Sequence, residues 1–195
     1  MGDSLHPEAL AAARTGAGWA FERVFAAFAP AVCGYLRAQG ARDPEGETNE
    51  VFLRVHRRLP AFEGDVDRFR SWVFAIAHNY VVDQRRWLRR RPVEDVVADT
   101  PVRPTGRDAG EEALARVAAA DVRALLGTLS PDQRDVLLLR FLADLSIEQT
   151  AAATGRTVTG VKALQRRGLD ALRRRLAAVS GPAVSLIDRS TFTTT

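Results

Sequence analysis

Arginines are the residues whose type and spacing most clearly define a chemistry in this sequence. Five of them fall within seven positions around Trp87, namely Arg85, Arg86, Arg89, Arg90 and Arg91. Guanidinium groups bind backbone phosphates, and an aromatic ring among them can stack on an unpaired base. The segment is therefore typical of nucleic-acid binding, whereas Phe69 and Trp72 upstream are better explained as core residues.

A second polar group follows in the stretch SIEQTAAATGRTVTGVKALQRRGLDALRRRL. Ala151 suits a close helix crossing, and Gly155 tolerates the positive φ of a tight turn. With Val161 on the inner face of a second helix that begins near Thr157, the pattern indicates a helix-turn-helix. Side chains suited to base edges and phosphates are left on the outer face: Arg156, Thr159, Lys162, Gln165, Arg166 and Arg167. The alternative is a plain pair of amphipathic helices with a solvated, Arg-rich face.

No set of residues forms a catalytic pattern. His6, His56 and His78 are scattered, the single cysteine Cys33 lies in an apolar stretch, and no spacing matches a metal site. A glycine-rich phosphate loop is also missing. We therefore expect a protein that is not an enzyme and that uses no metal or cofactor. We expect His78 at the surface or facing DNA, and Cys33 as a small buried hydrophobe.

The composition is that of a globular protein. Of 195 residues, 46% are hydrophobic and 27% charged, and the net charge is +4, which argues against a disordered chain. A single cysteine excludes a disulfide scaffold. No apolar run approaches the ~18 residues that span a bilayer, and no secretion signal is recognisable. A cytoplasmic protein without membrane insertion is the expectation.

Apolar residues recur at three- and four-residue spacing, which predicts an all-α fold. The expected helices are 7–15, 18–39, 44–59, 68–90, 111–127, 131–142, 146–154 and 157–178. Residues 92–110 contain three prolines and two glycines and carry a net charge of −2, whereas the segments on either side each carry +3. We therefore expect two small helical domains, 1–91 and 111–179, joined by a flexible linker, 92–110, and followed by a tail, 180–195. Each domain is short and is expected to be stable mainly when packed on the other or on a partner.

Three helix starts carry recognisable capping chemistry. Ser130 and Ser146 are each followed three residues later by glutamine, which is the pattern of a capping box. Asp43 precedes Pro44, a combination that favours a helix start at residue 44. The charged residues of that helix would either contact a protein partner or simply form a face exposed to solvent.

Three stretches, in this order, resemble bacterial RNA polymerase sigma factors of the extracytoplasmic-function (ECF) group. AARTGAGWAFERVFAAFAPAVCGYLR is similar to the opening helices of the family's region 2, and EVFLRVHRRLPAFEGDVDRFRSWVFAIAHNYVVDQRRWLRRRP to the remainder of that region. LGTLSPDQRDVLLLRFLADLSIEQTAAATGRTVTGVKALQRRGLDALRRRL resembles region 4. The resemblance covers roughly residues 8–91 and 111–177. It implies a promoter-specificity subunit with a region 2-like helical bundle and a region 4-like helix-turn-helix.

The resemblance also implies three sets of contacts. Contacts with the −10 element, as duplex and as melted strand, would come from Phe62, Glu63, Gly64, Asp65, Asn79, Tyr80, Asp83, Arg85, Arg86, Arg89 and Arg90. Contacts with the −35 element would come from Arg156, Thr157, Thr159, Lys162, Gln165 and Arg166. Contacts with the β′ clamp helices of core polymerase would come from Asp43, Glu47, Asn49, Glu50, Phe52 and Arg54. The face around Leu137, Leu138, Arg140 and Phe141 would meet the β flap, and an anti-sigma factor would be a further partner.

The sequence departs from the family pattern in three places. Gly46, Glu47 and Asn49 stand where the clamp-binding helix usually has an acidic residue, an apolar residue and glutamine. In the recognition helix Leu164 replaces the usual arginine, so the −35 contacts are expected to shift to Gln165 and Arg166.

The third departure lies in the first helix of the helix-turn-helix, where Thr150 and Thr154 replace apolar residues. These threonines would weaken the core of the motif unless their hydroxyls bond back to the helix.

Two other functions are kept as alternatives. A helix-turn-helix regulator would bind duplex DNA tightly without polymerase, although the arginines near residue 90 argue against it. A sigma-like protein-interaction module would stimulate no transcription, and the altered clamp-binding helix keeps this alternative open.

Overall fold

The computed structural model describes residues 5–90 and 121–180, and within these ranges every regular element is a helix. The predicted all-α class is confirmed. The elements are α1 (Pro7–Arg14), α2 (Gly18–Ala38), α3 (Pro44–Arg58), the 3-10 turn η1 (Leu59–Ala61), α4 (Val66–Arg90), α6 (Pro131–Phe141), α7 (Ile147–Thr154) and α8 (Val158–Ser180). Residues 121–127 are also helical. The predicted linker, the first part of the predicted helix 111–127 and nearly all of the tail lie outside the described residues.

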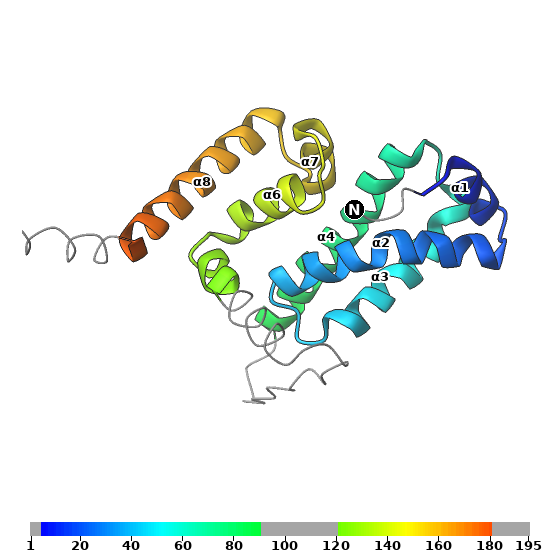
Figure 1. Ribbon diagram of the computed structural model, residues 1–195, viewed down its shortest axis with the longest axis horizontal. Helices are drawn as coiled ribbons and strands as arrows, with labels where there is room; N and C mark the ends of the chain where they lie inside the picture. Colours follow the sequence, from blue (N-terminus) through cyan, green and yellow to red (C-terminus); the bar gives the residue numbers. More distant parts are fainter. Residues whose placement is uncertain (1–4, 91–120, 181–195) are drawn as a thin grey trace, which may run out of the picture.

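The helices form two groups that pack on each other. In the first group α2 packs against α1, α3 and α4; in the second, α6, α7 and α8 contact one another. Helix α7 lies against α4 and joins the groups, as Figure 1 shows with α4 in green and α7 in yellow. One buried apolar cluster includes residues of α1–α4 together with Leu138, Leu139, Ala143, Leu145 and Ala153. The two parts therefore pack on each other in this structure.

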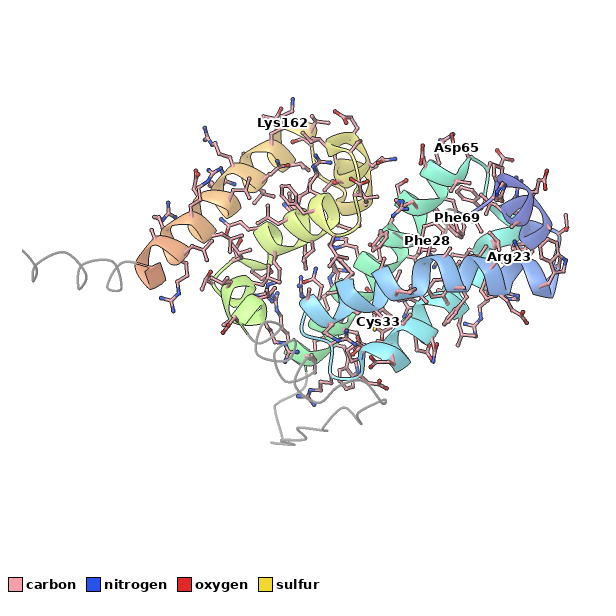
Figure 2. All side chains as sticks on the ribbon, in the orientation of Figure 1. Arg23, Phe28, Cys33, Asp65, Phe69 and Lys162 are labelled. Atoms are coloured by element: carbon pink, nitrogen blue, oxygen red, sulfur yellow. The ribbon has the colours of Figure 1, made fainter. Side chains whose placement is uncertain are left out.

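Aromatic side chains fill the centre of the first group. The ring of Phe69 lies 5.5 Å from that of Phe28 and 5.2 Å from that of Phe62, both edge-on. Figure 2 shows Phe28 and Phe69 between α2 and α4. Trp72 covers this cluster, with its ring 5.0 Å from that of Phe62. Edge-to-face rings at these separations are favourable beyond the area that they bury, and they hold the turn before α4 against the bundle.

The predicted helix starts are confirmed in detail. Both capping boxes are complete: Ser130 accepts from the Gln133 backbone N–H, and Ser146 accepts from that of Gln149. The side chain of Asp43 accepts from the Gly46 N–H at 3.0 Å. A Cβ on residue 46 would collide with the Asp43 carboxylate. Glycine at residue 46 therefore leaves room for the conformation that the Asp43 side chain adopts here.

The helix-turn-helix has the predicted core. Val136, Ala151, Val161 and Leu164 form a buried cluster, with Ile147 and Val158 at its edge. Gly155 ends α7 with φ +66°, the left-handed conformation that glycine adopts at little cost. This turn sets the direction in which α8 leaves α7.

The two threonines of α7 behave differently. The Thr154 hydroxyl donates to the Thr150 carbonyl at 2.8 Å, so it bonds back to the helix as expected. The Thr150 side chain is fully buried and its hydroxyl has no hydrogen-bond partner among the described residues. An unpaired buried hydroxyl lowers stability because it loses its hydrogen bonds to water.

Replacing Thr150 by valine should therefore stabilise the protein. Thr150→Val substitutes a methyl group for the unpaired hydroxyl, and we expect the free energy of unfolding to rise by about 1 kcal/mol. Thr154→Val is the matched control, because it removes a hydroxyl that is bonded, and it should be neutral or mildly destabilising. Urea unfolding followed by circular dichroism measures both. A less stable Thr150→Val variant would contradict the assignment of an unpaired hydroxyl.

Candidate nucleic-acid interface

Helix α8 carries the predicted polar face of the recognition helix. Thr159, Lys162 and Arg166 are exposed, and Arg156 and Thr157 are exposed just before α8 begins. Figure 2 shows Lys162 on the side of α8 that faces away from α1–α4. Gln165 is half-buried and accepts a hydrogen bond from Arg140 Nε at 3.3 Å. The structure thus brings five of the six predicted −35 residues to the surface and holds the sixth against α6.

An ion pair positions Arg156 at the start of this face. Its guanidinium lies 2.7 Å from the Asp132 carboxylate, and both side chains are well exposed to solvent. Exposed ion pairs of this kind add little stability. A phosphate can therefore replace Asp132 as the partner of Arg156 at small cost.

The turn before α4 presents an acidic edge. Glu63, Gly64 and Asp65 are exposed, whereas Phe62 is only 6% exposed and belongs to the aromatic core. Asp65 Oδ1 accepts from the Arg68 backbone N–H at 2.8 Å and so caps the start of α4; it is labelled in Figure 2. Gly64 has φ +148°, and a Cβ there would crowd Phe62 and Arg68. Phe62 therefore shapes this turn from beneath instead of offering its ring to solvent.

A cavity of about 370 Å³ opens beside this turn. Phe62, Glu63, Arg68 and Trp72 line one side of it. Residues of α7 line the other side: Gln149, Ala152 and Ala153. The turn predicted to receive a flipped base therefore faces the helix-turn-helix in this structure.

On α4, the predicted −10 residues fall into two environments. Asn79 and Asp83 are exposed, and Asp83 lies 3.7 Å from Arg54 of α3. Tyr80 is 5% exposed, its hydroxyl accepts from Gln84 Nε2 at 3.0 Å, and the Arg54 guanidinium lies 4.9 Å above its ring. Tyr80 thus supports the face that Asn79 and Asp83 present.

The arginines at the end of α4 are divided in the same way. Arg86, Arg89 and Arg90 are exposed and available to phosphates, while Arg91 lies outside the described residues. Arg85 instead points into the contact between the two groups of helices. Its NH1 donates to both carboxylate oxygens of Asp135 at 3.1 Å, and its NH2 donates to Gln39 Oε1 at 2.6 Å.

Asp135 is the centre of this polar network. It is 4% exposed on α6, and Gln39 Nε2 also donates to its Oδ1 at 2.8 Å. Gln39 Nε2 donates to the Tyr35 hydroxyl as well, at 3.0 Å. Because Arg85 only donates and a carboxylate only accepts, the Gln39 amide can take one orientation alone. Asp135 was not among the predicted site residues, since a single aspartate within a helix carries no signal of burial in the sequence.

His78 lies at the edge of the network and is 6% exposed. The prediction of a surface or DNA-facing His78 is wrong, because its side chain turns inward between α2 and α6. Its Nδ1 is 3.3 Å from the Tyr35 hydroxyl and 3.9 Å from Asp135 Oδ2. Burial lowers the pKa of His78 below 6.5, against the opposing effect of the Asp135 carboxylate. Burial also raises the pKa of Tyr35, with Asp135 acting in the same direction.

The residues predicted to contact the clamp helices are only partly available. Asn49 and Glu50 are exposed, while Phe52 is 2% exposed and packs against Phe25, with ring centroids 4.8 Å apart. The Asp43 side chain caps α3, and the Arg54 guanidinium contacts the Tyr80 ring and the Asp83 carboxylate. Glu47 is half-buried, and this burial raises its carboxyl pKa.

Three exposed apolar side chains on α2 and α3 were missed by the sequence analysis. They are Trp19, Phe25 and Leu53. Leu53 falls outside the buried stripe of α3, and this position could have identified it. In the second group of helices, Leu137 and Leu138 are buried, and Phe141 at the end of α6 is 62% exposed. Of the three apolar residues predicted to meet the β flap, Phe141 is therefore the one that is exposed in this structure.

Cys33 lies in a polar environment at the surface of the first group of helices. Cys33 is half-buried instead of buried, with its Sγ 3.6 Å from Arg37 NH2 and 3.7 Å from Glu45 Oε1, and burial raises its pKa. Figure 2 shows it between α2 and α3. Among residues 5–90 and 121–180, no group of three or more His, Cys, Asp or Glu side chains is placed to hold a metal ion. In the same ranges no helix is long and apolar enough to cross a membrane.

Two family models match this chain. The model described as "Sigma-70 region 2" matches residues 24–91, and the model described as "Sigma-70, region 4" matches residues 119–172. The two matches correspond to the two groups of helices. Their order is that of the sequence motifs.

Relatives are found among curated proteins and solved structures. The ECF RNA polymerase sigma factor SigD of Mycobacterium tuberculosis is 32% identical over 90% of this chain and 84% of its own length. The ECF RNA polymerase sigma factor BldN of Streptomyces coelicolor is 31% identical over 84% of this chain, which spans 63% of BldN. The structure of CnrH in complex with the cytosolic domain of CnrY is similar with a TM-score of 0.68 and 26% identity, over 90% of this chain and 99% of that one.

The burial of His78 predicts a pH-dependent stability. The unfolded chain binds a proton at His78 with a pKa near 6.5, and the folded chain binds it only at lower pH. As pH falls below 6.5 the unfolded state gains protons first, so the free energy of unfolding should fall. At pH values above 6.5 the stability that depends on a neutral, buried His78 is fully present.

Urea unfolding at about pH 7.5 and about pH 5.5 measures the effect, which is bounded by about 1.4 kcal/mol per unit of pKa shift. His78→Gln is the comparison, and it should lose this part of the pH dependence. A His78 imidazole that titrates at or above 6.5 by NMR would contradict the result.

Proposed function

Because this chain belongs to the ECF sigma factors of the sigma-70 family, we propose that it is a promoter-specificity subunit of bacterial RNA polymerase. In this role it binds core polymerase, recognises the −35 and −10 promoter elements and helps to open the DNA. It catalyses no reaction itself. It acts in the cytoplasm, where core polymerase meets DNA.

One observation carries this proposal: the chain has two separate basic faces on two groups of helices. The face of α8 carries Lys162 and Arg166 beside Thr159, and the end of α4 carries Arg86, Arg89 and Arg90. The first face suits base edges in a major groove, and the second suits phosphates. A regulator that reads one duplex site needs only the first face. Two faces in one chain support the recognition of two promoter elements.

On the −35 element, α8 would enter the major groove with Thr159, Lys162 and Arg166 towards the bases. Arg156 and Thr157 would hold the backbone at the start of α8. Leu164 is 9% exposed and packs in the core of the motif, so it cannot take the place of the family's usual arginine. This supports the transfer of that contact to Arg166, with Gln165 held by Arg140 behind it.

On the −10 element, Asn79 and Asp83 would read bases, while Arg86, Arg89 and Arg90 hold phosphates. Glu63, Gly64 and Asp65 would form the rim that receives a base removed from the stack. Preferential binding of the unpaired strand shifts the duplex towards the open state, because a ligand stabilises whichever state it binds more tightly. No chemical step is needed for this effect.

Contact with core polymerase would use the exposed residues of α3. Asn49 and Glu50 lie on that surface, and Leu53 adds an apolar side chain that is 48% exposed. CnrH, which this chain resembles, is solved in complex with the cytosolic domain of CnrY, and this supports a second kind of protein partner for this chain. The resemblance to ECF sigma factors suggests an anti-sigma factor in that role.

The function is tested by run-off transcription with sigma-free core polymerase from a GC-rich bacterium, on fragmented genomic DNA of the same origin. Discrete new transcripts that depend on this protein would support the proposal. Co-purification with core is checked in the same samples. If the protein neither binds core polymerase nor yields transcripts, the protein-interaction module is favoured instead. Tight binding to duplex DNA without polymerase would favour the regulator.

Single substitutions test the two DNA-binding faces. Arg166→Ala should reduce transcription that depends on the −35 element by removing a base contact, and Gln165→Ala should reduce it by releasing Arg140 from Gln165. Asn79→Ala and Asp83→Ala should impair −10 discrimination. A lost base contact costs about 1–3 kcal/mol, so Arg166→Ala, Asn79→Ala and Asp83→Ala should each change promoter preference by roughly 5- to 150-fold. Arg174→Ala is the control, because it removes an exposed arginine of α8 beyond the matched region 4. Unchanged preference in all four variants would refute this map.

A further inference from the structure

The contact between the two groups of helices engages a residue that the proposed function assigns to DNA. Arg85 is one of the arginines at the end of α4 expected to hold a phosphate. In this structure both of its terminal nitrogens donate to the other side chains of the network: NH1 to Asp135 and NH2 to Gln39. A carboxylate bound through both oxygens presents two acceptors to the guanidinium, as a phosphate does.

The same contact also closes the site beside the turn before α4. The cavity there is bounded by Glu63, Arg68 and Trp72 on one side and by Gln149 and Ala153 of α7 on the other. Ala153 and Leu145 are buried in the cluster that α1–α4 share. An unpaired strand that approaches Glu63 and Asp65 from this side would meet α7.

We propose that the Asp135–Arg85 contact is an autoinhibitory lock, in which the carboxylate of Asp135 takes the place of a DNA phosphate on Arg85. This inference rests on the proposed function, because it requires Arg85 to be a phosphate ligand in the open protein. In the locked state Arg85 is occupied and α7 stands beside the turn that would receive a base. Separation of the two groups of helices would free Arg85 and would move α7 away from that turn.

The chemistry of the lock suits a reversible contact. The Arg85 side chain is 23% exposed and that of Asp135 is 6% exposed, so both groups lose water when the contact forms. The loss of hydration offsets much of the attraction between such charges. A competing polyanion can then exchange with the Asp135 carboxylate on Arg85, whereas a purely apolar contact contains no charged group that a polyanion could replace.

The test compares Asp135→Asn with the wild-type chain, with no polymerase present. The probe is a fluorescein-labelled single-stranded DNA of about 12 nucleotides. Asp135→Asn should bind it about tenfold more tightly than wild type, and small-angle scattering should show a larger radius of gyration. Asp144→Asn is the matched control: it makes the same change of charge at an exposed residue whose φ of +55° asparagine also tolerates.

A double variant tests whether Arg85 is the group that is freed. The gain in DNA affinity should be largely lost in Asp135→Asn/Arg85→Gln, although the radius of gyration stays large. If circular dichroism shows that Asp135→Asn is unfolded, Ala153→Gln, which is bulkier but adds no charge, separates the helices at the α4–α7 contact with Asp135 and Arg85 intact. It should also increase both the radius and the affinity.

Equal affinity of Asp135→Asn and Asp144→Asn, or tighter binding without expansion, would overturn the lock. Run-off transcription with saturating core separates this result from a failure of the proposed function. Asp135→Asn should support at least as much transcription as wild type. Absence of product from every variant and from wild type would refute the proposed function, while the scattering and affinity data would still decide whether Asp135 restrains the helices.

Discussion

A buried carboxylate between two groups of helices is the constraint on which this structure depends. Asp135 is almost without solvent, and it is tolerated because Arg85 and Gln39 supply its hydrogen bonds from α4 and from the end of α2. Apolar contacts such as those of Leu139 and Leu145 are non-directional and would permit several arrangements. The hydrogen bonds of Asp135 select one arrangement, because any other leaves a charge buried without partners.

Neither group of helices has a large core of its own. The helix-turn-helix keeps a small cluster around Val136 and Val161, and its other apolar residues join the cluster of α1–α4. Small domains bury a limited fraction of their surface and gain stability from a shared core. The shared core therefore makes the packed state favourable, and it links the stability of the helix-turn-helix to the contact that restrains Arg85.

The surfaces proposed to bind DNA are built on well-anchored ends of helices. Ser146 and Gly155 fix the two ends of α7, and the direction of α8 follows from them. Asp65 caps α4, with Phe62 packed beneath the turn. Side chains such as Lys162 and Asn79 are thus presented from rigid helices and need no rearrangement of their own. The movement that the proposed lock requires lies between the groups of helices instead of within them.

The sequence by itself determined the elements of this protein. Capping residues, glycine at the turn and the spacing of apolar residues are local signals, and they placed the three capped helix starts, the helix-turn-helix and, apart from Gln165, the exposed positions of α8 correctly. The ordered motifs also indicated the family.

What only the tertiary structure decided is the environment of residues whose partners are distant in sequence. Asp135 and His78 read as ordinary polar residues, yet both are buried, because their partners Arg85, Gln39 and Tyr35 come from other helices. Phe52 and Phe62 read as candidate contacts and are core residues for the same reason. Burial and pairing depend on how helices pack, and that packing is set by contacts across the whole chain that no local pattern records.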